Sequence, residues 1–168
     1  MPTFQESLPR DALFVKVTRT IARPVPETFA YIVPVDVTHI FPRQGDMPGN
    51  VSTTVTTEWG QYVGQTRDTT ADDGSSFHET LTSLEANKSF AYKVENLTSA
   101  AMKGVVERIE GAWEFMDNGN GTTSIDWFYV LIPANAAAVD AIRDKIIPRY
   151  HGRLENAMSI LKADLERD

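Results

Sequence analysis

The chain has 168 residues, of which 42% are hydrophobic and 23% charged, and it contains no cysteine. These values are typical of one soluble globular domain, and the missing cysteines exclude disulfides, thiolate chemistry and cysteine-based metal sites. The net charge of −7, without any cluster of Lys and Arg, argues against nucleic acid or an anionic membrane surface as a partner. We find no secretory signal or bilayer-spanning apolar stretch, so we expect a cytoplasmic protein without membrane insertion.

The first quarter of the chain predicts an arm, one strand and two short helices. Residues 1–12 form the arm, and residues 13–168 form a single domain. Alternating β-branched residues predict a strand over 13–22, which ends at two prolines because proline cannot continue a ladder. Proline and glutamate in a first turn, followed by an apolar face, predict a helix over 26–33. A second short helix is expected over 35–41.

The pattern from residue 51 onward changes to strands separated by turn signals. The dipeptide Asp73-Gly74 is a hairpin signal, because glycine readily takes the positive φ that such turns require. Further turns are expected near residues 59–60, 85–88 and 118–121. The six predicted strands cover residues 51–58, 63–71, 76–84, 89–97, 105–117 and 122–132.

The last 34 residues predict one long amphipathic helix over 135–168. Apolar residues recur there every three or four positions, which forms a single helical stripe. Asn135 suits the N-cap, and Pro148 should kink the helix or split it in two. The stripe needs a long apolar partner, and the sheet is the only candidate. We therefore expect any functional space to lie between the sheet and this helix.

The lengths of the hairpin loops predict the strand register. A three-residue loop over 72–74 places Arg67 opposite Glu79, and a four-residue loop over 85–88 places Leu81 opposite Tyr92 and Ser83 opposite Phe90. Because side chains alternate along strands, one face of the sheet collects the aromatic residues and one ion pair. The predicted inner face includes Arg67, Phe77, Glu79, Leu81, Phe90, Tyr92, Trp113, Phe115, Trp127 and Tyr129.

Several motifs resemble the SRPBCC superfamily, and within it the polyketide cyclase/dehydrase-like branch. The similar stretch runs from VGQTRDTTADDGSSFHETLTSLEANKSFAYKV through GAWEF and NGTTSIDWFY to the final helix, and RTIARPVPETF also matches. The resemblance covers residues 13–166. The positions that carry it are Val63-Gly64, Arg67, Asp73-Gly74, Glu79, Tyr92, Gly121-Thr122, Trp127 and Leu161-Lys162.

The resemblance implies an α+β helix-grip fold. In that fold a curved seven-stranded antiparallel sheet, together with two short helices, wraps around a long C-terminal helix. It also implies a cavity that binds hydrophobic small molecules such as lipids, sterols, polyketides or plant hormones. Some members cyclise or dehydrate polyketides, but the family has no universal catalytic constellation to carry over.

The candidate ligand-binding residues combine the inner face of the sheet with the helix that covers it. The ion pair between Arg67 and Glu79 could orient a ligand, although a structural pair that fixes register is the simpler interpretation. Glu79, Tyr92 and His39 are the candidate acid/base residues, with His39 expected at the rim of the cavity. The candidate ligand-binding residues are Arg67, Phe77, Glu79, Leu81, Phe90, Tyr92, Trp113, Phe115, Trp127, Tyr129, Ile146, Tyr150 and Leu154.

Three functions stay open at this point. The first is binding of a hydrophobic small molecule, the second a cyclase- or dehydratase-like enzyme, and the third a protein-interaction module. The outward-facing residues Phe128, Val130 and Ile132 either form a homodimer patch or lie under the N-terminal arm. No cofactor is expected, and no metal, because the three histidines lack ligand spacing.

Overall fold

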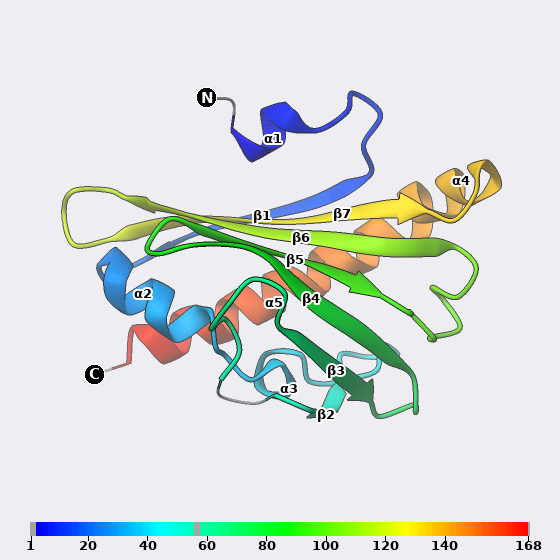
Figure 1. Ribbon diagram of the computed structural model, residues 1–168, viewed down its shortest axis with the longest axis horizontal. Coiled ribbons are helices and arrows are strands. Elements are labelled where there is room, and N and C mark those ends of the chain that lie inside the picture. Colours follow the sequence, from blue (N-terminus) through cyan, green and yellow to red (C-terminus); the bar gives the residue numbers. More distant parts are fainter. Residues whose placement is uncertain (1–2, 56–57, 168) are drawn as a thin grey trace.

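Seven strands form one antiparallel sheet in the order β1-β7-β6-β5-β4-β3-β2, so the first strand pairs with the last (Figure 1). The computed structural model describes residues 3–55 and 58–167. The strands are β1 (Phe14–Ile21), β2 (Asn50–Thr53), β3 (Thr66–Ala71), β4 (Ser76–Glu85), β5 (Ser89–Glu95), β6 (Val106–Asp117) and β7 (Thr123–Pro133).

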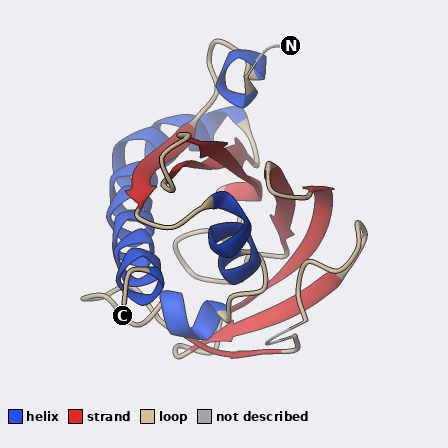
Figure 2. Cartoon of the chain, turned by 90° about the vertical axis from the view of Figure 1, so that its left-hand side faces the viewer, coloured by secondary structure: helices blue, strands red, loops and turns tan. Residues whose placement is uncertain are grey.

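The sheet curves into an arc, and the C-terminal helix closes its open side (Figure 2). The short helix α2 (Val25–Ile32) lies at the end of the strands where β6 turns into β7, and α3 (Val37–Ile40) leads into β2 (Figure 1). This arrangement confirms the predicted curved seven-stranded sheet around a long helix.

The pairing of β3 with β4 and of β4 with β5 confirms most of the predicted register. Arg67 lies opposite Glu79, and Leu81 lies opposite Tyr92. These residues are buried on the inner face of the sheet. A slip of one residue would have turned them toward solvent, so the two hairpin turns determine which side chains meet the helix.

The predicted pairing of Ser83 with Phe90 is wrong, because Leu84 lies opposite Phe90. The hairpin loop has three residues instead of four, and Asn87 takes a φ of 60° within it. A bulge between Leu81 and Ser83 then absorbs the extra residue and restores the predicted register further along the strand.

Residues 58–65 form a loop, although strands were predicted over 51–58 and 63–71. Residues 56–57 of the first predicted strand lie outside the described residues. The buried Gln65 side chain accepts hydrogen bonds from the backbone N–H groups of Gly60 and Gln61, both at 2.9 Å, and donates to the carbonyl of Glu58 at 2.7 Å. The backbone of Gly64 and Gln65 still bonds to Leu81 of β4, at 2.8 and 2.9 Å, but Gly64 has a φ of 96° and the chain turns away before it. The Gln65 side chain then holds residues 58–61 as a loop, so β2 and β3 are shorter than predicted.

The C-terminal helix begins at the predicted N-cap but is not one regular α-helix. Asn135 accepts a hydrogen bond from the N–H of Ala138 at 3.1 Å. Pro148 lacks the N–H that would continue the regular ladder, and a π-helical turn ends two residues before it. The segments are η1 (3₁₀, Ala136–Ala138), α4 (Val139–Ala141), η2 (π, Ile142–Ile146) and α5 (Ile147–Leu165).

Helix α5 buries one face against the sheet. Leu154, Ala157, Met158 and Leu161 are its fully buried residues, and their spacing confirms the predicted apolar stripe. None of the helices in the described part of the chain is long and apolar enough to cross a membrane.

The N-terminal arm contains a short helix, α1 (Phe4–Ser7), which covers the outer face of the sheet. The ring of Phe4 lies 4.9 Å from that of Phe128, measured between centroids. Phe128 under this ring is 1% exposed, and Val130 on the same face is 4% exposed. Of the two explanations for this outward apolar strip, the contact with Phe4 supports cover by the arm at Phe128, whereas Ile132 is only partly buried. A homodimer patch stays a prediction.

Candidate functional site

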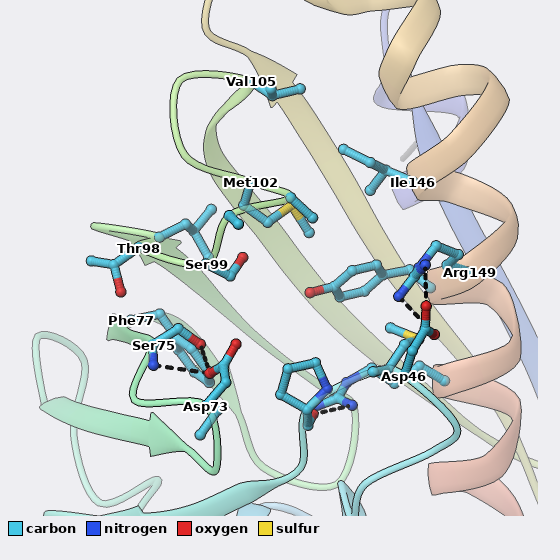
Figure 3. A pocket seen from close by; sticks show the side chains of 18 of the residues that line it. Asp46, Asp73, Ser75, Phe77, Thr98, Ser99, Met102, Val105, Ile146 and Arg149 are labelled. Atoms are coloured by element: carbon cyan, nitrogen blue, oxygen red, sulfur yellow. Dashed lines mark hydrogen bonds and ion pairs between the residues drawn. The ribbon is translucent and has the colours of Figure 1, made fainter.

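A cavity of about 460 Å³ opens between the C-terminal helix and one end of the sheet. Residues from four parts of the chain line it, within 46–50, 71–77, 97–105 and 141–153. Figure 3 shows the helix on one side of this space, and the turn before β4 and the connection from β5 to β6 on the other. The cavity therefore lies mainly among loops, at the edge of the strands.

The connection between β5 and β6 folds back toward the helix because of two backbone positions with positive φ. Asn96 follows β5 with a φ of 55°, and Gly104 precedes β6 with a φ of 75°. The Thr98 hydroxyl accepts a hydrogen bond from the N–H of Ser76 at 2.8 Å, which ties the connection to β4. These features hold Met102 in a buried position on the cavity wall.

One end of the cavity is apolar. Met102, Val105 and Ile146 gather there, from the β5–β6 connection and the C-terminal helix (Figure 3). Phe77 and Leu97 add further apolar surface to the lining. A ligand would gain binding free energy here mainly by removing apolar surface from water.

The other end of the cavity carries charges. The two terminal nitrogens of Arg149 donate to the two carboxylate oxygens of Asp46 at 3.1 and 3.3 Å (Figure 3). One turn further along the helix, Arg153 donates to the carbonyl of Pro48 at 2.9 Å. These bonds hold the loop that contains Asp46 against the helix.

A second feature is a buried ion pair deeper in the molecule. The Nε of Arg67 donates to Glu79 at 2.5 Å, and the two residues are 5% and 4% exposed. The guanidinium also lies 4.2 Å from the ring centroid of Trp59, a cation–π contact. In the described part of the chain, Nη1 of Arg67 is the one buried side-chain nitrogen or oxygen without a hydrogen-bond partner.

Aromatic rings surround this ion pair. Trp127 donates from Nε1 to the hydroxyl of Tyr92 at 3.1 Å. Burial, and then the nearby carboxylate of Glu79, raises the pKa of Tyr92 to about 12. Burial raises the pKa of Tyr129 well above its ordinary value, so both hydroxyls stay protonated at neutral pH.

Only a small void of about 30 Å³ remains beside these aromatic groups. The rings of Trp113 and Trp127 stack with centroids 4.2 Å apart, and Phe90 lies 5.6 Å from Trp113. Such close stacking fills the space that an apolar ligand would need. A void of this size holds about one water molecule.

Side chains separate the void from the large cavity. Tyr129 borders the void and Tyr150 borders the cavity, and their rings lie 6.1 Å apart. Phe41 borders the void, and the guanidinium of Arg153 lies 4.9 Å from its ring on the side of the cavity. The space between sheet and helix is thus divided into a cavity and a nearly filled region.

The predicted ligand-binding residues are divided between these two regions. Phe77, Ile146 and Tyr150 line the large cavity. Leu81, Phe115 and Leu154 are buried in the core and line neither space. The void is lined by Arg67, Glu79, Phe90, Tyr92, Trp113, Trp127 and Tyr129, among others. A binding role for any of these residues stays a prediction.

Of the three acid/base candidates, Glu79 and Tyr92 border the void, whereas His39 faces outward. Nε2 of His39 lies 2.7 Å from the Oδ2 of Asp164, an atom that also accepts a hydrogen bond from the hydroxyl of Tyr31 at 2.8 Å. The hydrogen bond to His39 is the main cause that lowers the pKa of Asp164. This cluster joins α2, α3 and α5 at the surface, and His39 lines neither space.

Several cavity residues were not identified from the sequence. They are the residues of the β5–β6 connection and the basic residues Lys145, Arg149 and Arg153 of the helix. The spacing of four residues between these basic positions was the available signal, because it places them on one side of a helix. In the described residues, no group of three His, Asp or Glu side chains is arranged to hold a metal ion.

The chain matches the family described as polyketide cyclase/dehydrase and lipid transport over residues 13–166. It therefore belongs to this family, and the expected SRPBCC resemblance is confirmed. A search of the curated proteins gives no match.

Solved structures share the fold at low sequence identity. An uncharacterised protein from Bacillus thuringiensis superposes with a TM-score of 0.63 at 13% identity, over 92% of this chain and 99% of that chain. Protein MLL2253 from Mesorhizobium loti gives 0.65 at 15%, over 92% and 97%. A protein from Arthrobacter aurescens gives 0.64 at 11%, over 95% and 89%. At these identities the likeness establishes the helix-grip fold alone.

Proposed function

We propose that the protein binds a hydrophobic small molecule in the 460 Å³ cavity. The observation that carries this proposal is the cavity itself, whose volume falls in the range of about 300–1,000 Å³ that ligand pockets occupy. Its apolar end offers Met102, Val105 and Ile146 as contact surface. The family description, which includes lipid transport, also supports this function.

The geometry gives less support to the two other functions. A cyclase-like reaction at Glu79 or Tyr92 requires a substrate to pass Tyr129 and Tyr150 and enter a void of about 30 Å³. An interaction through the outward apolar strip would require α1 to leave Phe128. Binding in the large cavity requires neither change.

A neutral fluorescent probe tests the proposal. N-phenyl-1-naphthylamine should bind the wild-type protein saturably, with increased emission. The Ala141→Phe variant places a ring on the cavity wall and should weaken binding about tenfold, equivalent to about 1.4 kcal/mol.

The matched control is Ala163→Phe, which adds the same ring at an exposed position of α5 outside the cavity lining. It should bind the probe as the wild type does. Thermal unfolding of both variants checks that they are folded. The proposal would be contradicted if the wild type did not bind the probe saturably, or if both variants lost the same amount of affinity for it.

A further inference from the structure

Three basic residues lie along the helix where it borders the cavity. Lys145, Arg149 and Arg153 are spaced four residues apart, which places them on one side of the helix, and all three line the cavity. The lining also contains two acidic residues, Asp46 and Asp73. The cavity therefore has more basic than acidic side chains, although the whole chain has 16 basic and 23 acidic residues.

Both acidic residues of the lining are already hydrogen-bonded to the protein. Asp46 accepts from Arg149, as described above, and Asp73 accepts from the N–H and the hydroxyl of Ser75 at 2.9 and 2.5 Å (Figure 3). In the described part of the chain, neither Lys145 nor Arg153 forms an ion pair with a carboxylate. Arg153 does interact electrostatically with Asp72, as one of the smaller causes that lower the pKa of Asp72. The rim thus has two basic side chains, Lys145 and Arg153, that are not in direct contact with a carboxylate among the described residues.

The contact between Asp46 and Arg149 shows which anion fits this rim. Two nitrogens of one guanidinium each donate to a different oxygen of one carboxylate. This paired geometry matches the planar shape of both groups. The side chains of Asp46 and Arg149 are 83% and 45% exposed, and exposed ion pairs contribute little to stability. A second carboxylate can therefore replace Asp46 at small cost.

We propose that the ligand is an apolar carboxylic acid, whose carboxylate binds Arg149 in place of Asp46, between Lys145 and Arg153. Its apolar body lies against Met102, Val105 and Ile146 at the other end of the cavity (Figure 3). This inference rests on the proposed function and adds the chemical class of the ligand. Asp46 acts as an internal competitor that keeps Arg149 paired in the unliganded protein.

Competition between two ligands of equal chain length tests this inference. Decanoate and decan-1-ol are each used to displace N-phenyl-1-naphthylamine, and each is also titrated directly by calorimetry. Decanoate should bind about fivefold more tightly than decan-1-ol, and this difference should shrink in 1 M NaCl because salt screens exposed charges.

Two variants of one ion pair should act in opposite directions. Arg149→Met should weaken decanoate binding about threefold to fivefold, whereas Asp46→Asn should strengthen it by a similar factor because Arg149 is released. Both variants should change the affinity for decan-1-ol much less than the affinity for decanoate, because decan-1-ol carries no charge to pair with Arg149. The matched controls are Arg143→Met and Asp140→Asn, which change the same charges at an ion pair of the same helical region outside the cavity lining.

The outcomes separate this inference from the proposed function. Equal affinities for decanoate and decan-1-ol, or weaker decanoate binding in both Asp46→Asn and Arg149→Met, would overturn the carboxylate assignment and leave the cavity as an apolar binding site. Equal effects of the control variants would also overturn the assignment, since they would indicate a general effect of net charge. Failure of both compounds to bind a protein that does bind N-phenyl-1-naphthylamine would overturn the inference alone. Absence of saturable probe binding to the wild type would overturn the inference and the proposed function together.

Discussion

The two ends of the space between sheet and helix differ in what fills them. At the end near α2, large rings stack closely and leave about 30 Å³, whereas at the end near the β5–β6 connection about 460 Å³ stays open. The first end, the aromatic end, contains the three tryptophans Trp59, Trp113 and Trp127. The lining of the second end includes Ala71, Ala100, Ala101 and Ala141. The comparison indicates that aromatic residues on the inner face fill the core and stabilise this fold, and that small residues and loops leave the open cavity.

The largest effect is expected when the buried ion pair is broken. Arg67→Met leaves the carboxylate of Glu79 buried without its partner, which should lower the free energy of unfolding by about 3–5 kcal/mol. Urea unfolding measures this change. Under native conditions the folded fraction should still bind N-phenyl-1-naphthylamine with unchanged affinity, because Arg67 does not line the large cavity.

Two further variants sharpen the result at Arg67. The double variant Arg67→Met/Glu79→Leu should recover most of the lost stability, since no unpaired charge stays buried. Arg108→Met removes a partly exposed arginine paired with Glu107 and Glu110 and should change stability by less than about 1 kcal/mol. If Arg67→Met lowered the free energy of unfolding by less than about 1 kcal/mol as well, the aromatic end would not be the end that stabilises the fold.

A smaller effect is expected at Gly111, which lies opposite Tyr92 in the sheet. A Cβ at Gly111 would lie 2.4 Å from the ring of Tyr92, so the ring would have to move within a filled region. Gly111→Ala should therefore destabilise the protein by about 1–3 kcal/mol in urea unfolding. The control is Gly152→Ala on α5, where a Cβ meets no atom within 4 Å, and where alanine should stabilise the helix by up to about 1 kcal/mol. If Gly111→Ala left the free energy of unfolding unchanged, the aromatic end would have free space beside Tyr92.

The sequence allowed the sheet, its curvature and most of its register to be predicted. Asp73-Gly74 fixed one hairpin, and alternation along the strands then placed Arg67, Glu79 and Tyr92 on one face. The hairpin loop after β4 was assigned one residue too many, because a bulge within a strand gives no clear sequence signal. The turn at residues 59–60 was predicted, but its extension to residue 65 was not, because it depends on the hydrogen bonds of the Gln65 side chain and on the positive φ of Gly64.

The candidate site was predicted less completely, since alternation shows which face a side chain occupies but not how much space its neighbours leave. Trp113 and Trp127 lie on the predicted inner face, and they stack on each other instead of enclosing a large cavity. The cavity depends on the path of the β5–β6 connection, where Asn96 and Gly104 turn the chain back toward the helix. That path is set by tertiary contacts such as the bonds between Ser76 and Thr98.

The most direct test of the difference between the two ends is to locate a bound apolar probe by NMR. N-phenyl-1-naphthylamine is titrated into the protein, and ring-current shifts are recorded for methyl groups and for tryptophan indole N–H groups. The largest shifts should occur at the methyl groups of Met102, Val105 and Ile146, with the indole signals of Trp113 and Trp127 almost unchanged. Largest shifts at Trp113 and Trp127, with little change at the three methyl-bearing residues, would place the ligand at the aromatic end and contradict the account.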